Sequence, residues 1–196
     1  MLERELAAWR RDQRERLLDM RRSMSSSERQ QHADKLIANL EAAFATIEGK
    51  SLGLYWPIKH EIDIRKWADG LSARRDIKLA LPVIDEPRQP LTYRHWHLGA
   101  TMTRGFWNIP VPVDTAAIHP DIVIAPLVGC WKMYRLGYGG GYFDRTLEAL
   151  KPRPLAVGIG LEAFRLAEFT PQPHDIPMDI IVTDETITDA RTPAGA

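Results

Sequence analysis

The sequence predicts an α/β protein, a three-layer sandwich with a largely parallel sheet. Short apolar segments alternate with amphipathic ones, which is typical of strand–helix units whose sheet is covered on both faces. The run at 122–128 is continuously apolar, as expected for a doubly buried strand. With 196 residues against about 150 per typical domain, we expect a single domain over 1–189 and a loose polar tail over 190–196.

Two amphipathic helices are predicted at the N-terminus. The first covers about 2–24, because mostly apolar residues recur there at the spacing of one helix face. This stripe consists of Leu2, Leu6, Trp9, Gln13, Leu17, Met20 and Met24. Ser25 and Glu28 have the spacing of a capping box, so a second helix is expected to begin there and to end at Gly49.

The remainder of the chain supplies the predicted sheet. Strands are expected at 52–56, 77–84, 91–97, 122–128, 155–160 and 180–183, with helices from Asp63, as the cap, to about Arg74 and over 141–150. Ligands of open α/β sheets bind beyond the carboxyl ends of the strands. The candidate walls of a site are therefore the loops after Trp56, Ile84, Val128 and Gly160.

Composition narrows the class of function. Lys and Arg number 26 and so do Asp and Glu, whereas dedicated nucleic-acid binders carry a basic excess. The longest strongly apolar run, 122–131, is half of the ~20 residues that span a bilayer, and no signal peptide is evident. We therefore expect a cytoplasmic protein with no nucleic-acid or membrane partner, and we expect it to be a monomer. Cys130 is the only cysteine, which excludes an internal disulfide, and its apolar setting predicts a buried, inert thiol.

The segment 135–145 reads Arg-Leu-Gly-Tyr-Gly-Gly-Gly-Tyr-Phe-Asp-Arg and carries the clearest chemistry. Four glycines in five positions follow a buried strand and precede a helix, so exposed N–H groups and a helix N-terminus can meet a phosphate. Arg135, expected to be an exposed loop residue, offers a guanidinium to phosphate oxygens. Asp144 could hold a Mg²⁺ ion that bridges phosphates. The alternative is a glycine-rich turn with aromatic packing, since neither the Walker nor the dinucleotide-binding pattern is matched.

Two arginines of the first helix suggest an external anion. Arg10 and Arg14 lie at the border of the apolar stripe and have no acidic residue three or four positions away. As a like-charge pair they are unfavourable by about 0.2–0.5 kcal/mol. The alternative is a solvated basic edge.

The glycine segment resembles the signature of the 5-formyltetrahydrofolate cyclo-ligase family, also called methenyltetrahydrofolate synthetases. The resemblance covers nearly the whole chain and includes Tyr55-Trp56-Pro57, Glu61-Ile62-Asp63, Leu81-Pro82-Val83, Gly158-Ile159-Gly160 and Pro173-His174-Asp175. It implies a fold related to ribose-5-phosphate isomerase and the CoA-transferases. It also implies the conversion of 5-formyltetrahydrofolate, with or without a polyglutamate tail, to 5,10-methenyltetrahydrofolate. That reaction uses ATP and Mg²⁺ and releases ADP and phosphate.

The resemblance also implies roles for individual residues. ATP would be bound by Arg10, Arg14, Arg135, Gly137, Tyr138, Gly139, Gly140, Gly141, Tyr142 and Asp144. Asp144 would hold Mg²⁺, and Arg135 and Tyr142 would act in catalysis without a covalent nucleophile. Glu61 would hold the pterin. An aromatic slot for it could be built from Tyr55, Trp56, Trp107 and Phe143, of which Phe143 stands where relatives often carry Tyr.

Two departures from the family pattern keep other functions open. Residues 130–134 are shorter than in relatives and lack an Asp and a Gly, and Val111 replaces a common Glu. A non-catalytic folate- or nucleotide-binding protein on the same scaffold is one alternative, and a sugar-phosphate isomerase-like enzyme is another. His95 and His97 share a strand face, which we interpret as solvated and not as a metal pair. His174 and Asp175 lack a partner nucleophile, so we interpret them as part of a structural loop.

Overall fold

The computed structural model describes residues 3–192, so Leu2 of the predicted stripe and 193–196 of the predicted tail lie outside the described residues. Its centre is a seven-stranded sheet in the order β11-β10-β9-β6-β1-β2-β3. These strands are β11 (Ile187–Asp189), β10 (Ile180–Val182), β9 (Leu155–Ile159), β6 (Ile122–Pro126), β1 (Ser51–Gly53), β2 (Lys78–Val83) and β3 (Thr92–Trp96). The five inner strands are parallel, and only the edges β11 and β3 are antiparallel. The predicted α/β class with a largely parallel sheet is confirmed; the domain boundary at 189 stays a prediction.

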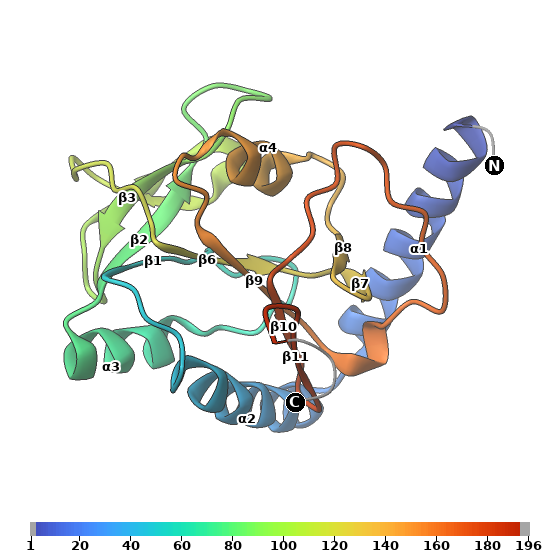
Figure 1. Cartoon of the computed structure of the whole chain (residues 1–196), viewed down its shortest axis with the longest axis horizontal. Helices are drawn as coiled ribbons and strands as arrows, with labels where there is room; N and C mark the ends of the chain where they lie inside the picture. The colour runs from blue at the N-terminus through green and yellow to red at the C-terminus, as the bar shows by residue number, and fades with distance from the viewer. Residues whose placement is uncertain (1–2, 193–196) are drawn as a thin grey trace.

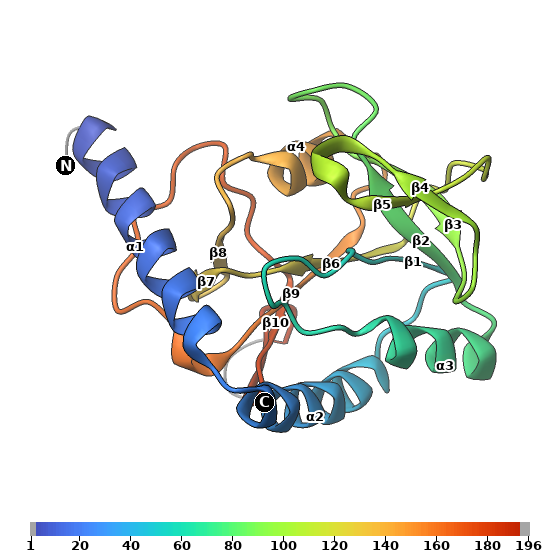
Figure 2. The same cartoon turned by 180° about the vertical axis from the view of Figure 1, so that it is seen from behind.

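Helices cover both faces of this sheet. They are α1 (Glu3–Ser23), α2 (Ser26–Phe44), α3 (Arg65–Arg75) and α4 (Tyr142–Ala149), with short 3-10 turns η1 (Phe106–Asn108) and η2 (Glu162–Phe164). Figures 1 and 2 show α2 and α3 on one face, α4 on the other, and α1 beside the end of the molecule that carries β7 (Gly129–Trp131) and β8 (Tyr134–Leu136). A further small hairpin joins β4 (Met102–Arg104) to β5 (Pro110–Pro112).

Alternating side chains of β6 explain its unbroken apolar sequence. Ile122 and Ile124 belong to the core cluster that includes residues of α2 and α3, whereas Val123 and Ala125 belong to the cluster on the α4 side. Successive side chains of a strand point to opposite faces, so a strand covered on both sides is apolar throughout. The interpretation of this run as a doubly buried strand is confirmed.

Helix α1 turns arginines as well as leucines toward the protein. Leu6 and Leu17 are buried, and so are Arg10 and Arg21, each four positions after one of these leucines on the same face. Met20, which the predicted stripe includes, is exposed instead. The pattern of apolar residues misplaces the buried face because two of its positions are occupied by cations with polar partners elsewhere in the chain.

The boundaries of several elements differ from the prediction. Ser25 and Glu28 form the predicted capping box, but α2 ends at Phe44 and not at Gly49. Asp63 does not cap α3: the cap position is Ile64, and the Asp63 carboxylate accepts a hydrogen bond from the Arg65 amide (3.0 Å). The observed strands are shorter than the predicted ones because the chain leaves the sheet early, at the edge where the loops of the site begin.

Candidate functional site

A cavity of about 820 Å³ opens beyond the carboxyl ends of β1, β2 and β6. Cavities of this size are typical of small-molecule sites. Its walls include Tyr55 and Trp56 after β1, Ile84 after β2 and Pro126 at the end of β6. The segments after Val128 and Gly160 contribute Leu136 and Gln172, so all four predicted loops line the cavity. All fifteen site residues predicted from the sequence line this one cavity.

The glycine loop, residues 137–141, runs from β8 into the first turn of α4. Gly139 (φ +93°) and Gly141 (φ +65°) have left-handed backbones that favour glycine, and Gly141 is the N-cap of the helix. A Cβ atom at Gly139 would lie 3.3 Å from the Arg14 guanidinium carbon. Gly140 has no positive φ, but a Cβ there would lie 3.0 Å from the Tyr142 ring. The glycines therefore let α1 and two aromatic rings approach the loop backbone closely.

Arg135 is buried and is not the exposed loop residue that the sequence predicts. It lies in β8 with 8% of its surface exposed, forms an ion pair with Asp144 in α4, and has its guanidinium 5.3 Å from the Phe143 ring centre. Burial lowers the pKa of Arg135, and Asp144 and Asp175 oppose that shift. The second Asp144 oxygen accepts a hydrogen bond from the Ile176 amide (3.2 Å). The arginine is buried because the β7–β8 hairpin pairs it with the buried Cys130, which places its side chain inside the protein next to the glycine loop.

The β7–β8 hairpin turns without a glycine. Its turn consists of Lys132 and Met133, and Lys132 adopts the left-handed backbone (φ +49°). The Lys132 amine lies 4.3 Å from the Trp131 ring centre. A left-handed lysine is strained by about 1–3 kcal/mol, so the surrounding contacts must hold it in place. The other departure, Val111, is buried in β5, where its methyl groups pack against Gly105.

The two arginines of α1 differ in their partners. Arg10 forms a two-pronged ion pair with Asp175 (3.1 and 2.5 Å) and donates to the Thr170 carbonyl (2.8 Å). The expectation that Arg10 is uncompensated is therefore wrong, because its partner lies 165 positions away and local spacing cannot reveal it. Arg14 donates from Nε to the Gly137 carbonyl (2.7 Å) and forms no ion pair with any residue that the structure describes. Burial, together with the Arg10 charge, lowers the pKa of Arg14.

Glu61 is a buried carboxylate on the wall of the cavity. Its Oε1 accepts a hydrogen bond from the Tyr138 hydroxyl (2.8 Å), and its Oε2 accepts one from the Ile58 amide (2.9 Å). The Arg21 guanidinium lies 4.0 Å from Oε1. Burial raises the pKa of Glu61, while these hydrogen bonds and the cations Arg21 and Lys59 lower it. Tyr138 belongs to the glycine loop, so the loop and the carboxylate adjoin.

The predicted aromatic residues line the cavity but do not form one stacked slot. The Arg65 guanidinium covers the Trp56 ring at 3.8 Å. Trp107, 63% exposed and left-handed (φ +54°), packs edge-on against Tyr142 with ring centres 5.6 Å apart. The hydroxyl oxygen of Tyr142 accepts a hydrogen bond from the Arg88 amide (3.2 Å).

Sequence reasoning missed several polar residues of this region, among them Arg21, Lys59 and Asp175. His174 and Asp175, interpreted from the sequence as part of a structural loop, both line the cavity. Arg21 lies 11 positions after Arg10, about three helical turns along, so the two arginines share one face of the helix. This spacing could have identified Arg21 from the sequence. Lys59 and Asp175 line the cavity from irregular segments, where no periodicity could point to them.

Three expectations outside the cavity can be compared with the structure. Burial raises the pKa of Cys130 to about 11, in line with an inert thiol. His95 and His97 lie with ring centres 6.2 Å apart, and residues 3–192 contain no group of three or more metal-ligating side chains. His97 lies just beyond the end of β3 and is exposed. In the described part of the chain no helix is both long and apolar enough to span a bilayer.

Comparison with known proteins finds one family. Residues 6–184 match the model of the 5-formyltetrahydrofolate cyclo-ligase family. The 5-formyltetrahydrofolate cyclo-ligase of Mycoplasma pneumoniae is 28% identical over 178 residues, covering 88% of this chain and 96% of the relative. The Mycoplasma genitalium protein of the same name is 25% identical over 174 residues, covering 85% of this chain and 93% of the relative.

Solved structures are similar as well. The 5,10-methenyltetrahydrofolate synthetase of Aquifex aeolicus superimposes with a TM-score of 0.80 at 26% identity, covering 95% of each chain. The synthetase of Mycoplasma pneumoniae superimposes with a TM-score of 0.72 at 25% identity, covering 89% of this chain and 98% of the other.

Proposed function

The chain belongs to the 5-formyltetrahydrofolate cyclo-ligase family, and we propose that it converts 5-formyltetrahydrofolate to 5,10-methenyltetrahydrofolate with consumption of ATP in the presence of Mg²⁺. ADP and phosphate are the other products. The observation that carries the proposal is the meeting of a glycine loop, buried arginines and a buried carboxylate in one cavity of about 820 Å³.

The nucleotide phosphates are proposed to lie against the glycine loop. Its backbone N–H groups and the N-terminus of α4 suit an anion. Arg14 contributes a charge with no carboxylate partner among the described residues, and Arg135 contributes a buried charge fixed by Asp144. Arg10 is proposed to act beside them, although Asp175 offsets its charge, so we expect its contribution to be smaller than that of Arg14.

Asp144 is the proposed protein ligand of Mg²⁺. Mg²⁺ usually keeps several waters and binds one or two carboxylates together with substrate phosphates, so a single side chain suffices when ATP supplies the other oxygens. Both Asp144 oxygens have partners, Arg135 and the Ile176 amide, yet a carboxylate offers about four lone pairs and retains acceptor capacity. The bound ion would neutralise charge on the phosphates.

The pterin is proposed to bind at Glu61. A pterin presents an amide N–H and an amino group side by side, and a carboxylate can accept from both. Tyr55, Trp56, Trp107 and Phe143 provide the apolar walls that such a flat ring needs. The hydrogen bond between Tyr138 and Glu61 makes the folate and nucleotide positions neighbours, as transfer of a phosphoryl group between them requires.

The protein's task in this chemistry is positioning and charge stabilisation. The formyl oxygen attacks the γ-phosphate of ATP, N10 then closes the five-membered ring, and phosphate leaves. Arg135 is proposed to stabilise the charge that develops on the transferred group. Tyr142 is proposed to donate a hydrogen bond to the substrate, since its oxygen already accepts from Arg88 and its proton is available. No side chain forms a covalent intermediate.

The assay is the absorbance rise of methenyltetrahydrofolate when protein is mixed with 5-formyltetrahydrofolate, ATP and Mg²⁺. We expect turnover that stops when ATP is omitted. Tight 5-formyltetrahydrofolate binding without turnover would favour the non-catalytic alternative, and chemistry on a sugar phosphate without ATP would favour the isomerase-like one. We also expect a cytoplasmic monomer without nucleic-acid or membrane partners, and light scattering on the purified protein checks the monomer.

A further inference from the structure

We propose that Arg21 is a positioning residue that ties the folate-binding carboxylate Glu61 to the glycine loop through the Tyr138 hydroxyl. The proposal rests on the proposed function, because it assigns Arg21 to the site where Glu61 would hold the pterin. Arg21 does not line the large cavity, so its role is to orient the groups that do.

Arg21 is fixed deep in the protein. It lies in the last turn of α1 with 6% of its side chain exposed, and donates to the Leu127 carbonyl (2.6 Å) just beyond the end of β6. Its guanidinium carbon lies 5.5 Å from the centre of the Phe164 ring. A buried guanidinium is costly unless its donors are bonded, so these contacts fix the position of the cation.

A directed chain of hydrogen bonds leads from Arg21 to Glu61. The guanidinium donates to the Tyr138 hydroxyl oxygen (3.1 Å), and that hydroxyl donates to Glu61 Oε1 (2.8 Å). Arginine is a donor only, so the Tyr138 oxygen must accept from it and the phenol proton must point toward Glu61. Burial and the nearby Glu61 raise the pKa of Tyr138, so the hydroxyl keeps this proton.

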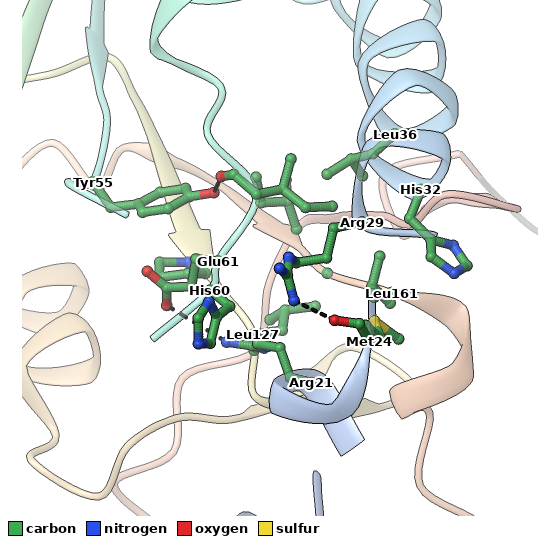
Figure 3. Close-up of a pocket in the computed structure, with 14 residues that line it drawn as sticks. Arg21, Met24, Arg29, His32, Leu36, Tyr55, His60, Glu61, Leu127 and Leu161 are labelled. Atoms are coloured by element: carbon green, nitrogen blue, oxygen red, sulfur yellow. Dashed lines mark hydrogen bonds and ion pairs between the residues drawn. The ribbon is translucent and has the colours of Figure 1, made fainter. Parts of the chain in front are cut away.

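Glu61, together with Tyr55 and Pro126, lines two cavities. It lines the large cavity and also a second cavity of about 30 Å³, enough for about one or two waters, on whose wall Arg21 lies. Figure 3 shows Arg21 of α1 and Glu61 directed toward one another across this small space, with His60 between the viewer and the pair. Arg21 thus contacts the carboxylate from the side of the small cavity, and the side that faces the large cavity is left open to a ligand.

The arrangement controls the charge of Glu61 as well as its direction. A carboxylate must be ionised to accept two hydrogen bonds from a pterin. The groups that face it are Arg21 from α1, Arg29 from α2, Tyr55 after β1, Lys59 and His60 from its own loop, and Tyr138 from the glycine loop. Burial alone raises the pKa of Glu61, and Arg21 is one of the groups that oppose this. Removal of the cation therefore protonates Glu61 at higher pH and weakens folate binding first at the acidic end.

The test compares Arg21→Met and Arg21→Lys with the matched control Arg22→Met. Arg22 is the neighbouring residue on the same helix, 70% exposed and paired with Asp19. For Arg21→Met we expect the KM for 5-formyltetrahydrofolate to rise about tenfold, the KM for ATP to change less than threefold, and the acid limb of kcat/KM to move to higher pH. Arg21→Lys should restore the acid limb and part of the KM, and Arg22→Met should behave as wild type.

Tyr138→Phe provides a second route to the same conclusion. It removes the link and leaves Arg21 in place, so it should raise the folate KM to a similar extent, and the double variant with Arg21→Met should be far from additive. If Arg21→Met does not fold, Arg21→Lys and Tyr138→Phe carry the test. A wild-type folate KM and acid limb in folded Arg21→Met, or a wild-type folate KM in both Arg21→Lys and Tyr138→Phe, would overturn the proposal.

Failure of this proposal and failure of the proposed function are distinguishable. A wild-type protein that turns over and an Arg21→Met variant identical to it contradict only the role of Arg21. A wild-type protein without turnover contradicts the proposed function. In that case the role of Arg21 is tested by the Kd for 5-formyltetrahydrofolate, measured by calorimetry. A Kd about tenfold higher in Arg21→Met supports the role, and an unchanged Kd contradicts it. Absence of any folate binding overturns both proposals.

Discussion

Arg135 and Asp144, nine residues apart, form a partly buried ion pair that joins the two ends of the glycine loop. Arg135 lies in β8 before the loop and Asp144 lies in the first turn of α4 after it. The pair therefore fixes the two ends of the loop relative to each other. The residues proposed to meet phosphate and Mg²⁺ are held in place by each other, so changing either affects both stability and binding.

Arg135→Ala should reduce both turnover and stability. Loss of a preorganised donor costs about 100- to 1,000-fold in kcat. Because Arg135 is buried and its removal leaves the partly exposed Asp144 without its ion-pair partner, unfolding free energy should also fall by about 1–3 kcal/mol. Steady-state kinetics and urea unfolding on the same sample check this. Near-normal kcat at saturating ATP would remove Arg135 from the catalytic step.

Asp144→Asn should weaken the Mg²⁺ dependence of ATP binding. The variant loses the charge that Mg²⁺ needs, and it leaves Arg135 without its ion pair, so unfolding free energy should fall by about 1–3 kcal/mol. ATP titrations with and without Mg²⁺ measure the first effect. Asp12→Asn is the control, since Asp12 is exposed and pairs with Arg11 on the surface, away from the cavity. Unaltered Mg²⁺ dependence in Asp144→Asn would exclude the carboxylate as a ligand.

Glu61→Gln should raise the folate KM and leave the ATP KM nearly unchanged. The substitution should not lower the free energy of unfolding at pH 7, although it weakens folate binding. The folded-state pKa of Glu61 is raised by burial, so its contribution to stability is complete below the ordinary Glu pKa of ~4.3 and declines as the pH rises through the folded value. At pH 7 the charge is unfavourable for folding, and the Gln variant should be at least as stable as wild type. A marked loss of stability at pH 7 with normal folate KM would assign Glu61 a purely structural role.

Glycine substitutions in the loop should separate ligand binding from backbone strain. Gly140→Val adds a branched side chain where the phosphates would lie, next to the Tyr142 ring, and should abolish ATP binding while the Tm without ATP falls only modestly. Gly139→Ala should combine about 1–3 kcal/mol of left-handed strain with contact against Arg14. Gly99→Ala is the control, because Gly99 has a similar φ (+89°), open space around it and no place in the cavity. Equal ATP affinity in all three folded variants would identify the loop as a structural turn.

The Cys130 thiol should not react in the folded protein. With its pKa raised by burial to about 11, the reactive thiolate is scarce at pH 8. Iodoacetamide labelling followed by mass spectrometry should modify Cys130 only after unfolding. Rapid labelling of the native protein at pH 8 would show that the β7–β8 hairpin opens readily.

Local patterns predicted the parts of this molecule that depend on local physics. The unbroken apolar run of β6, the capping box of Ser25 and Glu28, and the glycine loop each follow from short-range rules, and the corresponding elements are present. The alternation over 91–97 identified a strand but not its antiparallel direction, which only its pairing with β2 determines. The three-residue strands of the two hairpins are too short to show a period.

Residues whose partners are distant in sequence were misjudged. Arg10 was expected to lack a partner because Asp175 lies far along the chain, and Arg135 was expected to be exposed because the β7–β8 hairpin was not foreseen. Arg21 was missed because an arginine among charged neighbours resembles a solvated position. Only the tertiary arrangement places its guanidinium against Leu127 and Tyr138. Buried cations of a site are thus the features that sequence periodicity detects least well.

The most direct test of the central claim is the stoichiometry of one turnover mixture. Methenyltetrahydrofolate is followed by absorbance and phosphate by a coupled assay, with 5-formyltetrahydrofolate, ATP and Mg²⁺ present and with each omitted in turn. The proposed function predicts one phosphate released for each methenyltetrahydrofolate formed, and neither product when any component is missing. Methenyltetrahydrofolate formed without phosphate, or phosphate released at the same rate without folate, would contradict it.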